Sequence, residues 1–106
     1  MSGIEIKYDM KFAETGNLYF EVAERTNPLF NFSPSGIKRK DNAWLYLIGN
    51  YERAFLFSKR QLISIHENME SYGYMGIAEK ETATSKGFIL PVSKIPKWLI
   101  LKEFNF

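Results

Sequence analysis

The 106-residue sequence contains no cysteine. Without thiols there is no disulfide, no thiolate zinc site and no cysteine nucleophile. The absence of disulfides favours an intracellular, cytoplasmic setting.

Long apolar runs are missing as well. No segment approaches the roughly 20 apolar residues that span a bilayer, and no basic stretch with an apolar region begins the chain. We therefore expect no membrane partner and no export.

A phosphate loop and a dinucleotide fingerprint are also absent, so the sequence indicates no nucleotide cofactor. There is no Gly-x-Ser-x-Gly elbow, and the single histidine, His66, falls at a core-like position of a predicted helix.

Net charge is weak, at +2, but the positive residues are unevenly spread. Between residues 36 and 60 only Asp41 and Glu52 oppose six cations, which are Lys38, Arg39, Lys40, Arg53, Lys59 and Arg60. Such a cluster is either a solvated face or a surface that contacts nucleic acid.

Size and composition indicate one domain over residues 1–106, because two cores cut from this length would each be marginal. Hydrophobic residues make up 45% and charged residues 25%, as in ordinary globular proteins. No repeat or Pro/Gly/Ser-rich linker divides the chain.

Alternating apolar residues predict strands at 4–8 and 18–23, which we expect to form a hairpin across the turn residues 14–17. A loop at 25–35 and a short helix at 38–42 should precede a central strand at 43–48, which a tight turn joins to a strand at 51–57. Ser58 and Gln61 have the spacing of a helix cap, and apolar residues then continue at helical spacing to Tyr72, with Gly73 as the stop. A weak strand follows at 76–78, then a clearer strand at 87–92 and an apolar segment at 98–101.

Two acidic residues stand out on the first two predicted strands. Asp9 closes the first strand, and Glu21 lies inside the second between Phe20 and Val22. Carboxylates on adjacent strands can hold a divalent metal beside a phosphodiester. Glu21 could equally face solvent or pair with Lys7 or Lys11.

Five segments, two of which contain this pair, resemble a group of virus- and phage-type proteins in the PD-(D/E)XK nuclease superfamily. They are Ile4-Glu5-Ile6-Lys7-Tyr8-Asp9, Thr15-Gly16-Asn17-Leu18-Tyr19-Phe20-Glu21, Pro34-Ser35-Gly36-Ile37 with Ala43-Trp44-Leu45-Tyr46, and Ser85-Lys86-Gly87-Phe88-Ile89-Leu90-Pro91. The resemblance implies an α/β, restriction-endonuclease-like core, with a central mixed sheet and flanking helices. It also implies a virus-encoded enzyme that cleaves DNA with Mg²⁺ or Mn²⁺, and Asp9 and Glu21 as metal ligands.

Two departures from the superfamily pattern leave alternatives open. Ala23 occupies the position of the usual lysine, so Lys38 or Lys40 would have to supply that charge. The usual N-terminal helix is also lacking. A catalytically inactive nucleic-acid-binding or assembly protein with the same fold is the alternative.

A third interpretation is an oligomeric scaffold that associates through exposed aromatic residues, namely Phe30, Phe32, Phe104 and Phe106. A homodimer also fits the first two interpretations, because a small domain that cuts both strands of a duplex generally needs two sites, and two-fold pairing supplies them.

Overall fold

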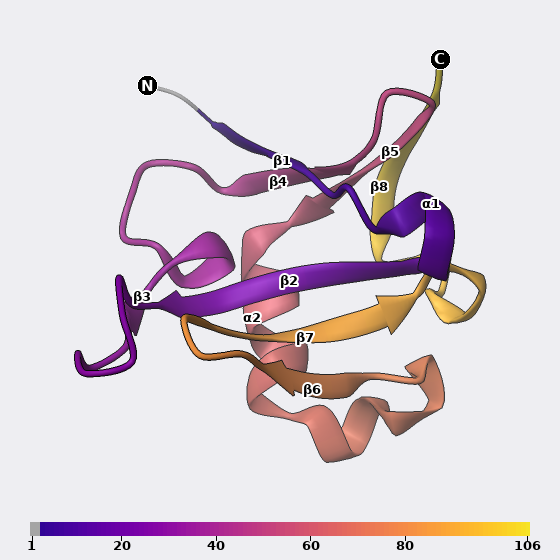
Figure 1. The fold of residues 1–106 in the computed structure, drawn as a ribbon. Helices are drawn as coiled ribbons and strands as arrows, with labels where there is room; N and C mark the ends of the chain where they lie inside the picture. The colour runs from indigo at the N-terminus through magenta and orange to yellow at the C-terminus, as the bar shows by residue number, and fades with distance from the viewer. Residues whose placement is uncertain (1–2) are drawn as a thin grey trace.

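A computed structural model describes residues 3–106, and the strands within this range form two four-stranded sheets (Figure 1). The first sheet has the order β1-β4-β5-β8, with β1 parallel to β4 and the remaining neighbours antiparallel. Its strands are β1 (Ile4–Tyr8), β4 (Leu45–Gly49), β5 (Arg53–Ser58) and β8 (Ile100–Asn105).

The second sheet is antiparallel throughout and has the order β3-β2-β7-β6. Its strands are β3 (Ser33–Pro34), β2 (Asn17–Glu24), β7 (Ser85–Pro91) and β6 (Ala78–Glu81). Two α-helices, α1 (Phe12–Thr15) and α2 (Lys59–Glu67), and three 3₁₀ helices, η1 (Gly36–Lys38), η2 (Met69–Met75) and η3 (Val92–Lys94), complete the described chain. The α/β class is confirmed, and the mixed sheet is one of two sheets.

Aromatic rings from both sheets meet in the core. The ring of Phe20 on β2 lies 6.1 Å from that of Tyr46, 5.4 Å from Phe57 and 5.2 Å from Phe88, measured between centroids. Helix α2 closes this core, since its Leu62 and Ile65 are buried. Burial of each such side chain stabilises the fold by about 1.5–3 kcal/mol.

Elements with strong local signals are confirmed. β4 and β5 form the expected antiparallel hairpin, and β4 lies inside its sheet. Helix α2 begins after Ser58, whose Oγ accepts a hydrogen bond from the Gln61 amide at 3.4 Å. This is the predicted cap.

The predicted hairpin between the first two strands is wrong. β1 pairs in parallel with β4, whereas β2 pairs with β7 in the other sheet. Helix α1 lies between β1 and β2 and ends at Gly16, whose φ of 71° turns the chain toward the second sheet.

Helical boundaries also differ from the prediction. The predicted helix at 38–42 is wrong, since η1 ends at Lys38 and the Asp41 side chain then accepts the Ala43 amide and turns the chain. Helix α2 ends at Glu67, since Asn68 leaves helical geometry with φ −132° and ψ 42°, and the chain continues as η2 to Gly76.

Candidate nucleic-acid interface and the acidic pair

Asp9 directs its carboxylate at backbone amides. Its Oδ1 accepts hydrogen bonds from the amides of Lys11 at 3.0 Å and Phe12 at 3.1 Å, and its Oδ2 accepts one from Tyr19 at 3.0 Å. The residue is buried. Asp9 therefore fixes the start of α1 and ties it to β2.

Glu21 is held by two serine hydroxyls. Ser35 donates to Oε1 at 2.8 Å, and Ser85 donates to Oε2 at 2.7 Å. Because the Ser85 proton is committed to Glu21, the Tyr19 hydroxyl must donate to Ser85 Oγ, 2.6 Å away. Burial is the main cause that raises the pKa of Tyr19, the hydrogen bond to Ser85 opposes it, and the charge of Glu21 adds a smaller increase.

Backbone geometry brings these groups together from distant segments. A bulge in β2 follows Glu21, where the register with β7 shifts between Glu21 and Ala23. Gly36, with φ of 54°, fits against Glu21, because a Cβ there would lie 2.1 Å from the Glu21 carbonyl oxygen. Three of the segments that carry the resemblance, 15–21, 34–37 and 85–91, therefore meet at Glu21.

The carboxylates of Asp9 and Glu21 are both engaged by hydrogen bonds within the protein. All four carboxylate oxygens of Asp9 and Glu21 already accept hydrogen bonds from the protein. Within residues 3–106, no three carboxylate or histidine side chains gather where they could hold a metal ion. No catalytic step through a metal follows from this geometry, and magnesium binding by Asp9 and Glu21 stays a prediction of the resemblance.

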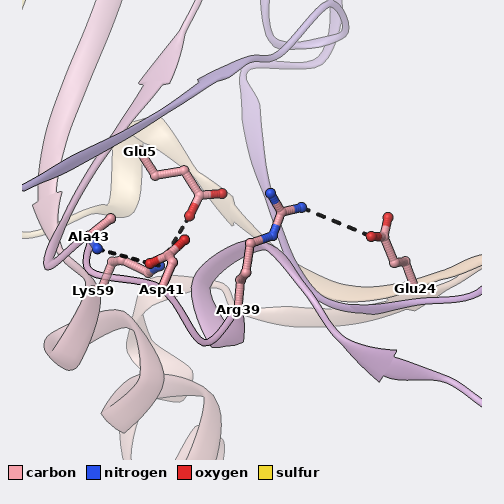
Figure 2. Close-up of polar contacts among 6 residues, drawn as sticks. All are labelled: Glu5, Glu24, Arg39, Asp41, Ala43 and Lys59. Atoms are coloured by element: carbon pink, nitrogen blue, oxygen red, sulfur yellow. Dashed lines mark hydrogen bonds and ion pairs between the residues drawn. The ribbon is translucent and has the colours of Figure 1, made fainter. Parts of the chain in front are cut away.

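Lys59 differs most from its predicted place on a nucleic-acid surface. Its side chain is only 6% exposed, and its Nζ lies 3.0 Å from Glu5 Oε1 and 3.2 Å from Asp41 Oδ1 (Figure 2). The amide of Ala43 lowers the pKa of Asp41 most strongly, and the hydrogen bond from Lys59 lowers it further. Lys59 is thus compensated within the fold and is not available to a phosphate.

Two other predicted cations have acidic partners. Arg53 donates to Glu103 Oε2 at 2.8 Å and lies over the Phe55 ring at 4.9 Å, at the far end of β5 from the remaining cations. Arg39 reaches Glu24 at 3.9 Å (Figure 2), and both side chains are exposed. Such a loose surface pair contributes about 1 kcal/mol or less, so Arg39 can exchange partners.

A groove beside α2 gathers the other predicted cations. It has a volume of about 420 Å³ and is lined by Ile37, Lys38, Arg39, Ala43, Trp44, Lys59, Arg60, Ile63, Ser64 and Glu67. We call it the Trp44 groove. Because Lys59 is already paired with Glu5 and Asp41, the other cations of the groove are Lys38, Arg39 and Arg60. Glu67 is the one carboxylate among the lining residues. Lys40 is exposed next to Arg39 but does not line the groove.

The exposure of Trp44 is the feature that the sequence pattern did not predict. It reads as part of a buried strand, yet β4 begins at Leu45 and the Trp44 side chain is 65% exposed. The backbone around it is fixed, since its amide donates to the Gly3 carbonyl at 3.1 Å and its carbonyl accepts the Lys59 amide at 3.0 Å. The basic run that precedes it, residues 38–40, was the available signal.

Comparison with protein-family models finds no matching family, and no curated protein or solved structure matches the chain. Within residues 3–106, no helix has the length and apolar character needed to cross a bilayer. A functional assignment therefore rests on the geometry of the side chains.

Proposed function

We propose that this protein binds single-stranded nucleic acid along the Trp44 groove. The observation that carries the proposal is the exposed indole of Trp44 in a groove lined by Lys38, Arg39 and Arg60. An exposed aromatic ring offers a stacking surface for an unpaired base, and the cations of the same groove can neutralise the phosphates that flank it.

The support of Trp44 suits this role. A Cβ at Gly3 would lie 2.7 Å from the indole Nε1, so the ring rests against backbone without side-chain cover at that point. Backbone hydrogen bonds hold the residue between β1 and the start of α2. A ring held in this way loses little conformational entropy when a base stacks on it.

Fluorescence anisotropy with labelled single-stranded DNA, single-stranded RNA and duplex DNA tests the proposal. Trp44→Ala should weaken single-strand binding by about 1–3 kcal/mol, or roughly 5- to 150-fold, and Trp44→Phe should retain much of it. Trp98→Ala is the matched control, because Trp98 is also exposed but does not line the groove. Equal effects of the two alanine variants would overturn the proposal.

Salt dependence isolates the contribution of the cations. Each of Lys38→Ala, Arg39→Ala and Arg60→Ala should reduce the slope of log affinity against log salt concentration by about 0.7 for single strands. Lys97→Ala, at an exposed position outside the groove, should leave the slope unchanged.

A further inference from the structure

A second hollow lies where the end of β1 and α1 meet the surface of the second sheet. It has a volume of about 320 Å³ and shares no lining residue with the Trp44 groove. Its walls are Lys7, Tyr8, Asp9, Met10, Lys11, Tyr19, Lys80, Thr82 and Ser85. We call it the three-lysine hollow.

Three separate elements supply its positive charge. Lys7 lies on β1, Lys11 precedes α1, and Lys80 lies on β6. All three side chains are exposed, and none forms an ion pair with another residue of the described range 3–106. These three charges reach the hollow from different elements, and none of them is bound in an ion pair within the described residues.

The carboxylate in the hollow does not cancel this charge locally. Asp9 turns both oxygens toward the amides of Lys11, Phe12 and Tyr19. The three lysines against this one carboxylate still leave the lining of the hollow with a net charge of 3 − 1 = +2. An anion that enters the hollow therefore meets lysine ammonium groups rather than a free carboxylate edge.

Tyr19 supplies a flat aromatic wall. Gly87 on the neighbouring strand leaves room for the ring, since a Cβ there would lie 2.8 Å from two of the ring carbons. The hydroxyl is fixed to Ser85 at 2.6 Å, and Lys80 Nζ lies 5.6 Å from the ring centroid. Because Lys80 Nζ lies over the ring, a base or sugar can pack on the ring when this exposed side chain turns to contact the phosphate.

From this geometry we infer that the three-lysine hollow binds a phosphorylated nucleotide, with its phosphate at Lys7, Lys11 and Lys80 and its base or sugar against Tyr19. The volume lies at the lower end of the range for small-ligand pockets, which suits one nucleotide. The nucleotide is either free or the terminal residue of a strand, because both carry the same phosphate chemistry. The inference does not depend on the Trp44 groove.

Isothermal titration calorimetry on the full chain with AMP and adenosine tests the phosphate requirement. AMP should bind at least tenfold more tightly than adenosine. Lys11→Ala/Lys80→Ala should remove that difference, whereas Lys97→Ala/Lys102→Ala, which removes the same charge at exposed positions outside the hollow, should preserve it. Equal affinity for AMP and adenosine, or equal loss in the two double variants, would overturn the inference.

Oligonucleotides with and without a 5′-phosphate distinguish the two sources. Tighter binding of the phosphorylated strand, lost in Lys11→Ala/Lys80→Ala, assigns the hollow to strand ends. AMP binding without an effect of the 5′-phosphate assigns it to free nucleotides. Trp44→Ala should leave AMP affinity unchanged. The experiments can therefore overturn single-strand binding at the Trp44 groove and nucleotide binding at the three-lysine hollow independently of each other. Thermal unfolding of each variant confirms that these surface substitutions leave the fold intact.

Discussion

The ring of Tyr19 lies across Gly87, and a Cβ at Gly87 would approach two of its ring carbons to 2.8 Å. The same Cβ would lie 2.3 Å from the carbonyl oxygen of Phe20. The position thus controls both the placement of Tyr19 and the spacing of β2 and β7.

Gly87→Ala should therefore destabilise the protein by about 1–3 kcal/mol, the usual cost of overpacking a closely fitted site. Urea unfolding measures the change. Gly73→Ala is the control, because a Cβ at Gly73 meets nothing within 4 Å, and its stability should stay equal or rise by about 0.4–1 kcal/mol. Equal stability of the two variants would contradict the close approach of Tyr19 to Gly87.

Asp9→Ala should also act on stability. The substitution leaves the buried amide of Phe12 and the amide of Tyr19 without an acceptor, at a cost of about 1–3 kcal/mol. Glu14→Ala, at an exposed site on α1, should change stability little. If Asp9→Ala retains full stability, the three hydrogen bonds that backbone amides donate to the Asp9 carboxylate do not stabilise α1.

Magnesium should not alter nucleic-acid affinity when ionic strength is matched, and Glu21→Gln should bind as the original protein does. Anisotropy in Mg²⁺, Mn²⁺ and EDTA measures this, and gels of the same oligonucleotides report cleavage. Cleavage that requires either metal and disappears in Glu21→Gln would instead support the metal site that the resemblance implies.

Stability should fall as the pH decreases below about 6.5, the ordinary pKa of histidine. Burial, and next the charge of Lys38, lowers the pKa of His66 in the folded protein, although Glu79 and Glu67 oppose this. The unfolded chain then binds more protons than the folded chain between the lowered pKa and 6.5, so acid favours unfolding there. Urea unfolding of His66→Gln should show a free energy of unfolding that depends less on pH over this interval. An unchanged pH dependence would exclude His66 as its source.

Self-association is expected through the uncovered face of the first sheet. A hollow of about 560 Å³ there is lined mainly by apolar groups, with Ile6 75% and Phe106 77% exposed. Sedimentation velocity should show a dimer that Ile6→Glu converts to a monomer. Leu29→Glu, at a 92% exposed loop position outside the hollow, is the control, and a monomer at all concentrations would contradict the homodimer.

The four aromatic residues expected to form an interface are divided by the fold. Phe106 stacks on Phe104 with ring centroids 6.2 Å apart, beside the uncovered face. Phe32 is half-buried and its ring contacts the cations of Arg25 and Lys86, and Phe30 is exposed on the loop before β3. Only the C-terminal pair lies near the apolar hollow.

Features encoded by neighbouring residues were predictable from the sequence. The cap at Ser58 and the turn between β4 and β5 depend on residues a few positions apart, and both are present. The partner of β1 was not predictable, because alternation identifies a half-buried strand without naming its neighbour. The buried ion pair of Lys59 was not predictable for the same reason, since its partner Glu5 is remote in sequence.

The Trp44 groove was predictable only in part. The basic run at 38–40 indicated a contact surface, but a lone indole inside an apolar run does not reveal which face it takes. Ser35, Ser85 and Tyr19 were equally inconspicuous, because their hydroxyls meet Glu21 only after β2, β7 and the loop between β3 and η1 have come together.

The strand pairing has a consequence for biosynthesis. Three pairs join consecutive strands, namely β2 with the two-residue β3, β4 with β5 and β6 with β7, whereas β1 must wait for β4, β2 for β7, and β5 for β8. Because Leu18 and Phe20 have no partner strand until residues 85–91 have left the ribosome, the nascent chain exposes an apolar segment through most of its translation. We therefore expect slow translation to favour aggregation of this protein, and binding of a ribosome-associated chaperone to β2 to suppress it.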